Sequence, residues 1–409
     1  MKYGLIGEKL GHSYSCQVHR ALGNPDYVLK EIAPDALGDF LRARDFAGLN
    51  VTIPYKQAVI PYVDALTDTA REVGAVNTLY FDASGTLWGD NTDVYGFCAM
   101  LEGIDVRGKK ALVLGSGGTS HTACYALRAL GAGDCIVVSR RGAVNYENVY
   151  SLHADAEVIV NATPVGMFPN NGARPIDIRR FPRLCAVADV IYNPARTALL
   201  QDADALGIPR AGGLSMLVAQ AARSVERFSG RALGEEAWRG ALSQVAASLR
   251  GVALVGMPGC GKSTIAQAVA KELGRACVDL DAEIERAAGK SIPEIFAQEG
   301  EEAFRAAETR AARQFSRENA VLATGGGCVL RTENAQALRA NSLVVWLKRA
   351  IDQLPREGRP LSAGNLYEMA QKRAPYYRAA SDVQIENRGS VEEVAAAVAA
   401  ALREGAVHL

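Results

Sequence analysis

Two glycine-rich loops, each set between an apolar run and a helical pattern, constrain this chain more than any other feature. The first spans residues 115–120 (GSGGTS) after the run 111–114, and the second spans residues 256–264 (GMPGCGKST) after the run 251–255. A glycine-rich turn between a strand and a helix directs backbone N–H groups toward phosphate oxygens. Because each loop follows its own strand, the sequence predicts two separate nucleotide-binding sheets.

Apolar strand-like runs alternate with helical stretches along the whole chain, which is typical of an α/β protein with mainly parallel sheets. A helical stretch over about 234–249 runs directly into the second glycine-loop strand, so we expect one half at 1–248 and another at 249–409. The first half is expected to divide again, into a nucleotide-binding lobe of about 103–213 and a second lobe formed by about 1–102 and about 214–248.

Composition excludes several classes of protein. The 409 residues include 45 Lys and Arg against 45 Asp and Glu, so the chain lacks the basic excess of a general nucleic-acid binder. No apolar run approaches the length of a membrane span and no signal-peptide core is visible, which predicts a cytoplasmic location. The eight cysteines form no CxxC pair, so reduced thiols are expected and zinc is not. Small molecules are therefore the expected partners.

The second loop matches GxxxxGK[ST] in full. In such a loop Lys262 can span the β- and γ-phosphates and Ser263 can ligate Mg²⁺. Downstream, Asp279 and Asp281 lie at i and i+2 on a strand end, where they could serve the metal and a hydroxyl acceptor. Further arginines and a triple glycine (325–327) follow; alone, each of these is typical of a solvated face or a turn.

In their order, these motifs resemble shikimate kinase over residues 251 to about 405. The resemblance implies a parallel-sheet phosphate-loop domain that uses ATP and Mg²⁺. It assigns the metal to Ser263 and Asp279, and a catalytic role to Lys262 and Asp281. It implies shikimate contacts at Asp281, Arg305, Gly326 and Arg373, and nucleotide contacts at Gly259, Cys260, Gly261, Lys262, Ser263, Thr264 and the lid arginine Arg359. The stretch 353–358 is several residues shorter than the family's usual lid.

The first loop departs from GxGxxG because Ser120 occupies the third glycine position. A second strand, 135–138, follows the intervening helix and completes a βαβ unit that can hold a pyrophosphate. Ser139, Arg140 and Arg141 stand at its end, where a protein that prefers NAD usually has an acidic residue. Cations and a hydroxyl suit a 2′-phosphate, so NADP(H) is the predicted cofactor; two ordinary surface arginines are the alternative.

The first lobe carries a set of hydroxyls, amides, one lysine and one aspartate in loops that follow apolar segments. The motifs are 11–15 (GHSYS), 50–56 (NVTIPYK), 74–78 (GAVNT) and 89–93 (GDNTD). Pro54 is expected to begin a helix with Lys56 in its first turn. Such groups suit a polyhydroxylated, carboxylated ring, although each motif alone is more often a turn or a helix cap.

Together these patterns resemble shikimate dehydrogenase, across roughly residues 1–235, with a nucleotide-binding lobe of the Rossmann fold. The resemblance implies catalytic roles for Lys56 and Asp93. It implies substrate contacts at Ser13, Ser15, Thr52, Asn77, Asp93, Tyr192 and Gln220. It implies cofactor contacts at Asp68, Gly115, Ser116, Gly117, Gly118, Thr119, Ser139, Arg140, Val190 and Gly213.

The expected function is therefore two consecutive reactions: reduction of 3-dehydroshikimate with NADPH, then phosphorylation of shikimate by ATP. Three alternatives stay open: a quinate/shikimate dehydrogenase with broader cofactor use, a half that serves only as a regulatory or scaffolding module, and a phosphate-binding regulator. Each half carries its own motifs and no insert is visible at the join. We therefore expect the halves to act independently, without a tunnel between them.

Overall fold

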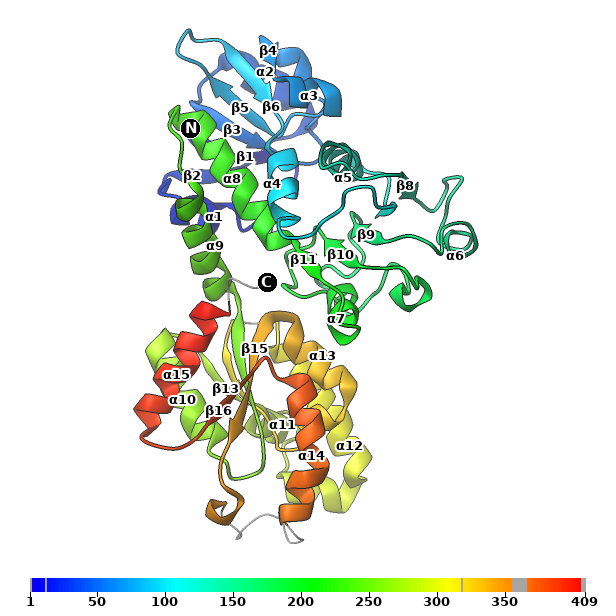
Figure 1. Cartoon of the computed structure of the whole chain (residues 1–409). Coiled ribbons are helices and arrows are strands. Elements are labelled where there is room, and N and C mark those ends of the chain that lie inside the picture. Colours follow the sequence, from blue (N-terminus) through cyan, green and yellow to red (C-terminus); the bar gives the residue numbers. More distant parts are fainter. Residues whose placement is uncertain (1, 12, 318, 355–365, 406–409) are drawn as a thin grey trace.

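The computed structural model describes residues 2–11, 13–317, 319–354 and 366–405. It contains three sheets, and Figure 1 shows two halves, one above the other, joined where α9 (Glu235–Leu249) runs into β12 (Gly251–Val255). The predicted α/β class, with parallel sheets in both nucleotide-binding regions, is confirmed. Across the described residues, no helix is long and apolar enough to span a bilayer.

The first lobe is built on a six-stranded mixed sheet of order β2-β1-β3-β5-β6-β4. Strand β5 pairs antiparallel with both β3 and β6, whereas β1 pairs parallel with both β2 and β3. The bounds are β1 (Tyr3–Gly7), β2 (Tyr27–Glu31), β3 (Gly48–Val51), β4 (Ala65–Leu66), β5 (Thr78–Phe81) and β6 (Leu87–Asp90), with helices α1 (Ser15–Ala21), α2 (Leu37–Ala43) and α3 (Asp68–Val73).

One local expectation for this lobe was wrong: Pro54 does not begin an α-helix. Residues 53–59 form successive turns, and only a short 3₁₀-helix, Ile60–Tyr62, follows. The turns hold Lys56 against the next loop, because the Lys56 carbonyl accepts a hydrogen bond from the Val76 N–H. This long-range contact, invisible to local propensity, decides the conformation.

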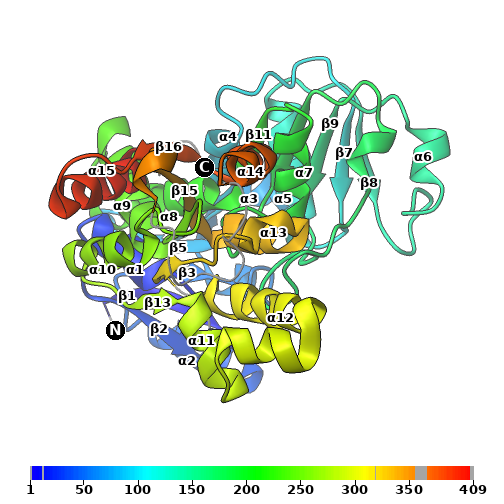
Figure 2. The same ribbon diagram turned by 90° about the horizontal axis from the view of Figure 1, so that it is seen from below.

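The nucleotide-binding lobe is a parallel sheet of order β11-β10-β9-β7-β8 with helices on both faces. Alternate residues of β7 divide between the faces: Val113 packs with α5 residues such as Leu127, whereas Leu112 packs with α7 residues such as Leu199. In Figure 2 this lobe lies to one side of the C-terminal half. The bounds are β7 (Ala111–Leu114), β8 (Cys135–Val138), β9 (Val158–Asn161), β10 (Ala186–Asp189), β11 (Arg210–Gly212), α5 (Gly118–Ala129), α6 (Val149–Leu152) and α7 (Ala198–Ala205).

Two helices connect the lobes: α4 (Thr92–Met100) leads out of the first lobe and α8 (Gly213–Ser229) returns to it. They pack closely at Gly96, where an added Cβ would lie 2.5 Å from the Met216 carbonyl oxygen and 2.9 Å from the Gln220 Cβ. Helix α9 then packs with α8 and α1 around Trp238 and Val245. The last helices of the N-terminal half thus belong to the first lobe's core.

The C-terminal half is a parallel sheet of order β13-β14-β12-β15-β16. Strand β12 begins after a single connecting residue, Arg250, and runs away from the N-terminal half (Figure 1). The remaining bounds are β13 (Cys277–Asp279), β14 (Val321–Ala323), β15 (Ser342–Lys348), β16 (Val383–Glu386), α10 (Lys262–Leu273), α11 (Leu280–Ala288), α12 (Ile292–Phe315), α13 (Thr332–Asn341), α14 (Leu366–Ala380) and α15 (Val391–Glu404). Because β12 spans five residues, its phosphate loop lies roughly 16 Å beyond the join.

The close packing of α4 on α8 gives a stability prediction. Gly96→Ala should destabilise the N-terminal half by about 1–3 kcal/mol, because the new methyl group overlaps backbone and side-chain atoms of α8. Gly240→Ala in α9 is the matched control: its Cβ meets no atom within 4 Å, so it should stabilise by up to about 1 kcal/mol. The measurement is the midpoint temperature of thermal unfolding. Midpoints that shift in the same direction in both variants would contradict this packing.

Candidate active sites

The first candidate site is a cavity of about 210 Å³ between the two lobes of the N-terminal half. It lies at the strand ends of both sheets, the usual position of ligands in open α/β folds. All seven substrate contacts expected from the sequence line this cavity: Ser13, Ser15, Thr52, Asn77, Asp93, Tyr192 and Gln220. The expected catalytic residue Lys56 and three of the expected cofactor residues, Thr119, Val190 and Gly213, line it as well.

An ion pair occupies one wall of this cavity. The Lys56 Nζ lies 2.6 Å from the Asp93 Oδ2, and Asp93 Oδ1 accepts a hydrogen bond of 2.9 Å from the Asn77 Nδ2. Lys56 comes from the turns after β3, Asn77 from the residue before β5, and Asp93 from the first turn of α4. The Lys56 side chain is 25% exposed and that of Asp93 is 15% exposed. The ammonium is therefore accessible from the cavity, while Asn77 holds the Asp93 carboxylate in place.

The other walls supply neutral hydrogen-bonding groups. The Ser13 hydroxyl donates to the Ser15 hydroxyl at 2.9 Å, so the two hydroxyls face the same point. The Gln220 amide oxygen lies 3.4 Å from the Asn77 Nδ2, which brings α8 into the same network. The Tyr192 ring closes a further side and packs against Tyr14, with ring centroids 5.4 Å apart.

The first glycine loop opens toward this cavity from the nucleotide-binding lobe. Gly117 caps the N-terminus of α5, and an added Cβ at Gly117 or Gly118 would meet no atom within 4 Å. The loop therefore leaves the helix N-terminus open to an anionic group. Ser139 and the exposed Arg140 follow the end of β8, adjacent to this loop, because the Gly115 N–H donates to the Val138 carbonyl.

Seven of the expected cofactor residues do not line this cavity: Asp68, Gly115, Ser116, Gly117, Gly118, Ser139 and Arg140. Asp68 is the one among them that lies on neither the glycine loop nor the end of β8. It lies in the first turn of α3, its side chain is 91% exposed, and its carboxylate pairs with Arg71. In this structure it therefore contacts its own helix and not the pocket.

The second candidate site is a cavity of about 950 Å³ at the carboxyl edge of the C-terminal sheet. Most residues expected from the sequence line it: Gly259, Gly261, Lys262, Ser263, Thr264, Asp279, Asp281, Arg305, Gly326 and Arg373. The Cys260 side chain is fully buried, so only its backbone can serve a ligand. Arg359 lies outside the described residues.

The phosphate loop has the conformation that its glycines permit. Gly256, Gly259 and Gly261 all have positive φ, and the Lys262 Nζ folds back onto the Gly256 and Met257 carbonyl oxygens at 3.0 Å each. The Ser263 hydroxyl donates to the Asp279 Oδ2 at 2.6 Å. A hydroxyl and a carboxylate oxygen side by side are the kind of ligands that Mg²⁺ prefers.

Asp281 does not continue the strand, as the sequence suggested, but lies in the first turn of α11, with Asp279 as the helix cap. Burial and the nearby Asp279 carboxylate raise the pKa of Asp281. Its Oδ1 is buried without a hydrogen-bond partner in the described structure, next to Gly325. A buried acceptor without a partner is costly, so this oxygen is poised for a donor from a ligand.

Sequence reasoning missed Glu308, which holds Arg305 in place. The Arg305 Nη1 donates to the Glu308 Oε2 at 2.9 Å, and the Glu308 side chain is only 1% exposed. Burial raises the pKa of Glu308, with the Arg305 charge opposing this effect. The spacing of three residues on one helix was a usable signal, since i and i+3 side chains share a face.

Tyr377 is a second missed residue. Its hydroxyl donates to the Gly326 carbonyl at 2.5 Å, and Arg373 donates to the same oxygen at 3.1 Å. Both side chains come from α14, one turn apart. They fix the triple-glycine loop, in which an added Cβ at Gly326 would lie only 2.6 Å from the Pro258 Cγ.

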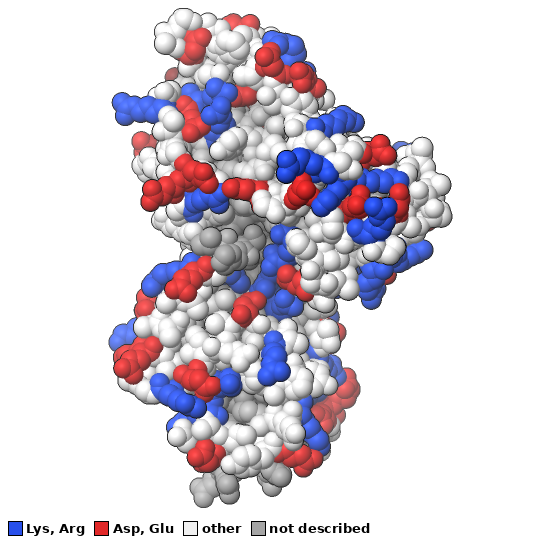
Figure 3. All heavy atoms as spheres, viewed as in Figure 1, with Lys and Arg blue, Asp and Glu red and all other residues white. Residues whose placement is uncertain are grey.

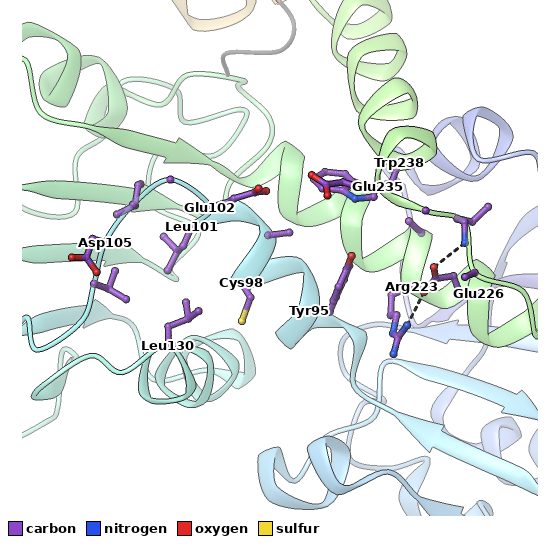
Figure 4. Close-up of a pocket in the computed structure, with 18 of the residues that line it drawn as sticks. Tyr95, Cys98, Leu101, Glu102, Asp105, Leu130, Arg223, Glu226, Glu235 and Trp238 are labelled. Carbon is purple, nitrogen blue, oxygen red and sulfur yellow. Dashed lines mark hydrogen bonds and ion pairs between the residues drawn. The ribbon is translucent and has the colours of Figure 1, made fainter.

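A third cavity of about 770 Å³ lies on the other side of α4 and α8 (Figure 4). Tyr95 and Cys98 of α4, Glu226 of α8 and Trp238 of α9 line it. None of the residues that the sequence singled out faces this cavity, and its carboxylates stand mainly on the rim. We assign no chemistry to it.

Comparison with protein families matches both parts of the chain. Residues 5–79 match the model for the "Shikimate dehydrogenase substrate binding domain", and residues 258–403 match the model for "Shikimate kinase". The first range contains Lys56 and Asn77, and the second contains the phosphate loop from Gly259 onward and Arg373.

Individual relatives match the N-terminal half. A protein named shikimate dehydrogenase (NADP(+)) from Oleidesulfovibrio alaskensis is 40% identical over 255 residues, which cover 56% of this chain and 90% of that protein. A chorismate mutase/shikimate 5-dehydrogenase fusion from Clostridium acetobutylicum is 35% identical with a TM-score of 0.55, covering 58% and 94%. Quinate dehydrogenase from Corynebacterium glutamicum in complex with NAD is 30% identical with a TM-score of 0.52, covering 56% and 94%.

The Arg305–Glu308 pair generates a prediction for the C-terminal site. Glu308→Gln should slow phosphorylation of shikimate and leave nucleotide affinity unchanged, because Arg305 loses its fixed orientation while the phosphate loop is untouched. Glu301→Gln is the matched control: Glu301 contacts the same guanidinium at 3.2 Å but is 63% exposed, so its loss should have a smaller effect. Turnover and nucleotide titration of both variants test this, and equal effects from both would contradict a special role for Glu308.

Proposed function

The chain belongs to the shikimate dehydrogenase family and carries a shikimate kinase domain, and we propose how its two sites perform consecutive steps of one pathway. The N-terminal site reduces 3-dehydroshikimate to shikimate with NADPH. The C-terminal site phosphorylates the 3-hydroxyl of shikimate with MgATP. The observation that supports this most strongly is that all seven expected substrate contacts line one cavity together with the Lys56–Asp93 pair.

In the reduction, the chain's own residues hold the substrate and manage a proton, while NADPH supplies the hydride when bound. The Lys56 ammonium is placed to polarise the carbonyl and to protonate the developing alkoxide. Asp93 orients the ammonium, and Asn77 fixes Asp93 in turn. Ser13 and Ser15 offer paired hydroxyls to the carboxylate end of the ring, opposite the reacting carbon.

The open N-terminus of α5 fits a pyrophosphate, and Arg140 fits the 2′-phosphate that distinguishes NADPH from NADH. Arg140 is exposed, with no acidic residue beside it in the segment Ser139–Gly142. This segment supports NADP(H) as the cofactor. The N-terminal relative from Oleidesulfovibrio alaskensis is itself named for NADP(+).

In the phosphorylation, the protein contributes position and charge, while MgATP supplies the phosphoryl group when bound. Lys262 can leave the two loop carbonyls for phosphate oxygens, and Ser263 with Asp279 would hold the metal. The Asp281 carboxylate accepts a hydrogen bond from the 3-hydroxyl of shikimate and aligns that hydroxyl for in-line attack on the transferred phosphoryl group. Arg305 and Arg373 pair with the shikimate carboxylate, the geometry that a guanidinium fork favours.

A second candidate for the N-terminal half is quinate oxidation. The likeness to the NAD-bound quinate dehydrogenase supports it, because both proteins share the same two-lobed fold. The segment Ser139–Arg141 favours the first candidate, since it lacks a carboxylate for the ribose hydroxyls of NAD. Turnover of shikimate and quinate with each cofactor separates the two.

The proposal is tested by product analysis with 3-dehydroshikimate, NADPH and MgATP. The intact chain should form shikimate 3-phosphate. Lys56→Ala should lower the reduction by about 10²-fold or more and leave phosphorylation of added shikimate intact. Asp281→Asn should show the converse pattern and accumulate shikimate. Near-normal reduction by Lys56→Ala, or intact phosphorylation by Asp281→Asn, would overturn the corresponding site.

Cofactor choice gives a separate prediction. Arg140→Ala should raise the KM for NADPH by about tenfold, the effect of one lost charge-assisted contact, and leave NADH use nearly unchanged. Arg128→Ala, a cation near the end of α5 and away from the loop, is the control and should change neither constant. If Arg140→Ala affected both cofactors equally, this arginine would not contact the 2′-phosphate.

A further inference from the structure

The two halves are joined by more than the chain, because Arg196 of the N-terminal half is inserted into the C-terminal half. Its Nη1 and Nη2 donate to the two carboxylate oxygens of Asp382 at 2.6 and 2.8 Å. Its Nε donates to the Arg339 carbonyl at 2.8 Å, and Nη2 also reaches the Ser342 carbonyl at 3.0 Å. Figure 3 shows cationic side chains gathered in the notch between the halves.

This ion pair is largely buried, and both terminal nitrogens of the guanidinium contact the carboxylate. The Arg196 side chain is 5% exposed and that of Asp382 is 19% exposed. Burial alone would raise the pKa of Asp382, but Arg196 outweighs it and holds that pKa below its ordinary value. Asp382 directly precedes β16 and is held against β15, since its Oδ2 accepts from the Val344 N–H at 2.9 Å. Arg196 is therefore fixed to a rigid element of the other half.

Arg196 belongs to the loop 190–197, which carries two residues of the N-terminal site, Val190 and Tyr192. The ends of this loop are fixed within its own lobe: the Ile191 N–H and the Thr197 hydroxyl both donate to Asp189. Its middle also contacts its own half, where the Asn193 carbonyl accepts from the Phe168 N–H at 3.0 Å and the Ile191 carbonyl accepts from the Gly213 N–H at 3.1 Å. Within the described part of the chain, only Ala195 and Arg196 of this loop are fixed from the other half. The Ala195 N–H donates to the Asn341 side chain at 2.9 Å, and the Arg196 N–H donates to the Ala340 carbonyl at 2.9 Å.

Tyr192 stands between the N-terminal site and the junction of the halves. It lines the substrate cavity, and it also lines a small cavity whose walls include Arg250, Arg317 and Asn341. The Tyr14 ring supports it from a third side. A shift of Ala195 and Arg196 along this loop would be passed to the Tyr192 ring, which faces the same cavity as Lys56 and Gln220 from another element.

We propose that Arg196 and Asp382 are positioning residues for the dehydrogenase: the C-terminal half, through Asp382, holds the loop that places Tyr192 against the substrate. The inference rests on the proposed function of the N-terminal site. It makes one half a structural component of the other half's substrate pocket. Because Lys56 and Asp93 come from other elements and keep their own contacts, loss of this support weakens substrate binding more than it slows the chemical step.

The test uses the full chain and measures shikimate oxidation with NADP⁺. Asp382→Asn keeps an acceptor for the Val344 N–H but removes the charge that orients Arg196. It should raise the KM for shikimate by about tenfold, change kcat by less than about twofold, and leave phosphorylation of shikimate unchanged. Arg196→Lys, which retains the charge but not the two-pronged contact, should raise the same KM by a smaller factor.

The matched control is Asp204→Asn. Asp204 bridges to Arg339 across the same junction at 3.2 Å, but it lies in α7 and contributes nothing to the loop 190–197. This variant should leave the shikimate KM unchanged. A double variant, Arg196→Lys with Asp382→Asn, should raise the KM no further than Asp382→Asn alone, because both changes remove one interaction.

Hydrogen exchange of the Ala195 and Arg196 amides gives a readout that does not depend on the activity. Both amides should exchange faster in Asp382→Asn than in the parent chain and Asp204→Asn. An unchanged shikimate KM, or equal KM shifts in Asp382→Asn and Asp204→Asn, would overturn the positioning role. A parent chain that does not oxidise shikimate would instead overturn the proposed function, while faster exchange would still support the contact.

Discussion

A single residue, Arg250, separates the last helix of the N-terminal half from the first strand of the C-terminal half, and this short join sets the geometry of the whole molecule. Arg250 is buried, and its carbonyl accepts a hydrogen bond from Arg275. The neighbouring Asn319 side chain donates to the Ser248 carbonyl at 3.0 Å. The join therefore cannot act as a flexible linker, and β12 must start at the N-terminal half and point away from it.

Because nucleotides bind at the carboxyl ends of parallel strands, that direction places the phosphate loop on the far side of the C-terminal sheet. The substrate cavity of the N-terminal half opens between its own two lobes. The two sites thus lie on opposite sides of the junction, which contains contacts such as Arg196 with Asp382 and a small cavity of about 20 Å³ lined by described residues. We therefore expect a product of the first site to reach the second through solvent.

Much of the two sites could be predicted from the sequence, because glycine loops and charged motifs act through short spacings along the chain. The Lys262–Ser263 pair is of this kind, whereas Asp93, the partner of Lys56 at 37 positions along the chain, was expected from the resemblance to shikimate dehydrogenase. Local pattern failed at Pro54, where a contact with Val76 replaces the expected helix with turns. Local pattern also failed to identify Glu308, because its role in holding Arg305 depends on its burial and not on spacing alone.

The junction could not be predicted at all. Arg196 and Asp382 are 186 positions apart, and each alone is an ordinary charged residue between secondary-structure elements. Only the fold brings them together and excludes water from them. The expectation that the halves act independently stays a prediction, to which the structure adds the contact of Arg196 with Asp382.

The most direct test of the account follows labelled 3-dehydroshikimate through both reactions on the intact chain, with NADPH, MgATP and an excess of unlabelled shikimate. This account predicts that the intermediate is released to solvent, so added shikimate should dilute the label in shikimate 3-phosphate in proportion to its pool. Label that reaches the phosphorylated product undiluted would contradict this account, since it would require an enclosed path between the two cavities.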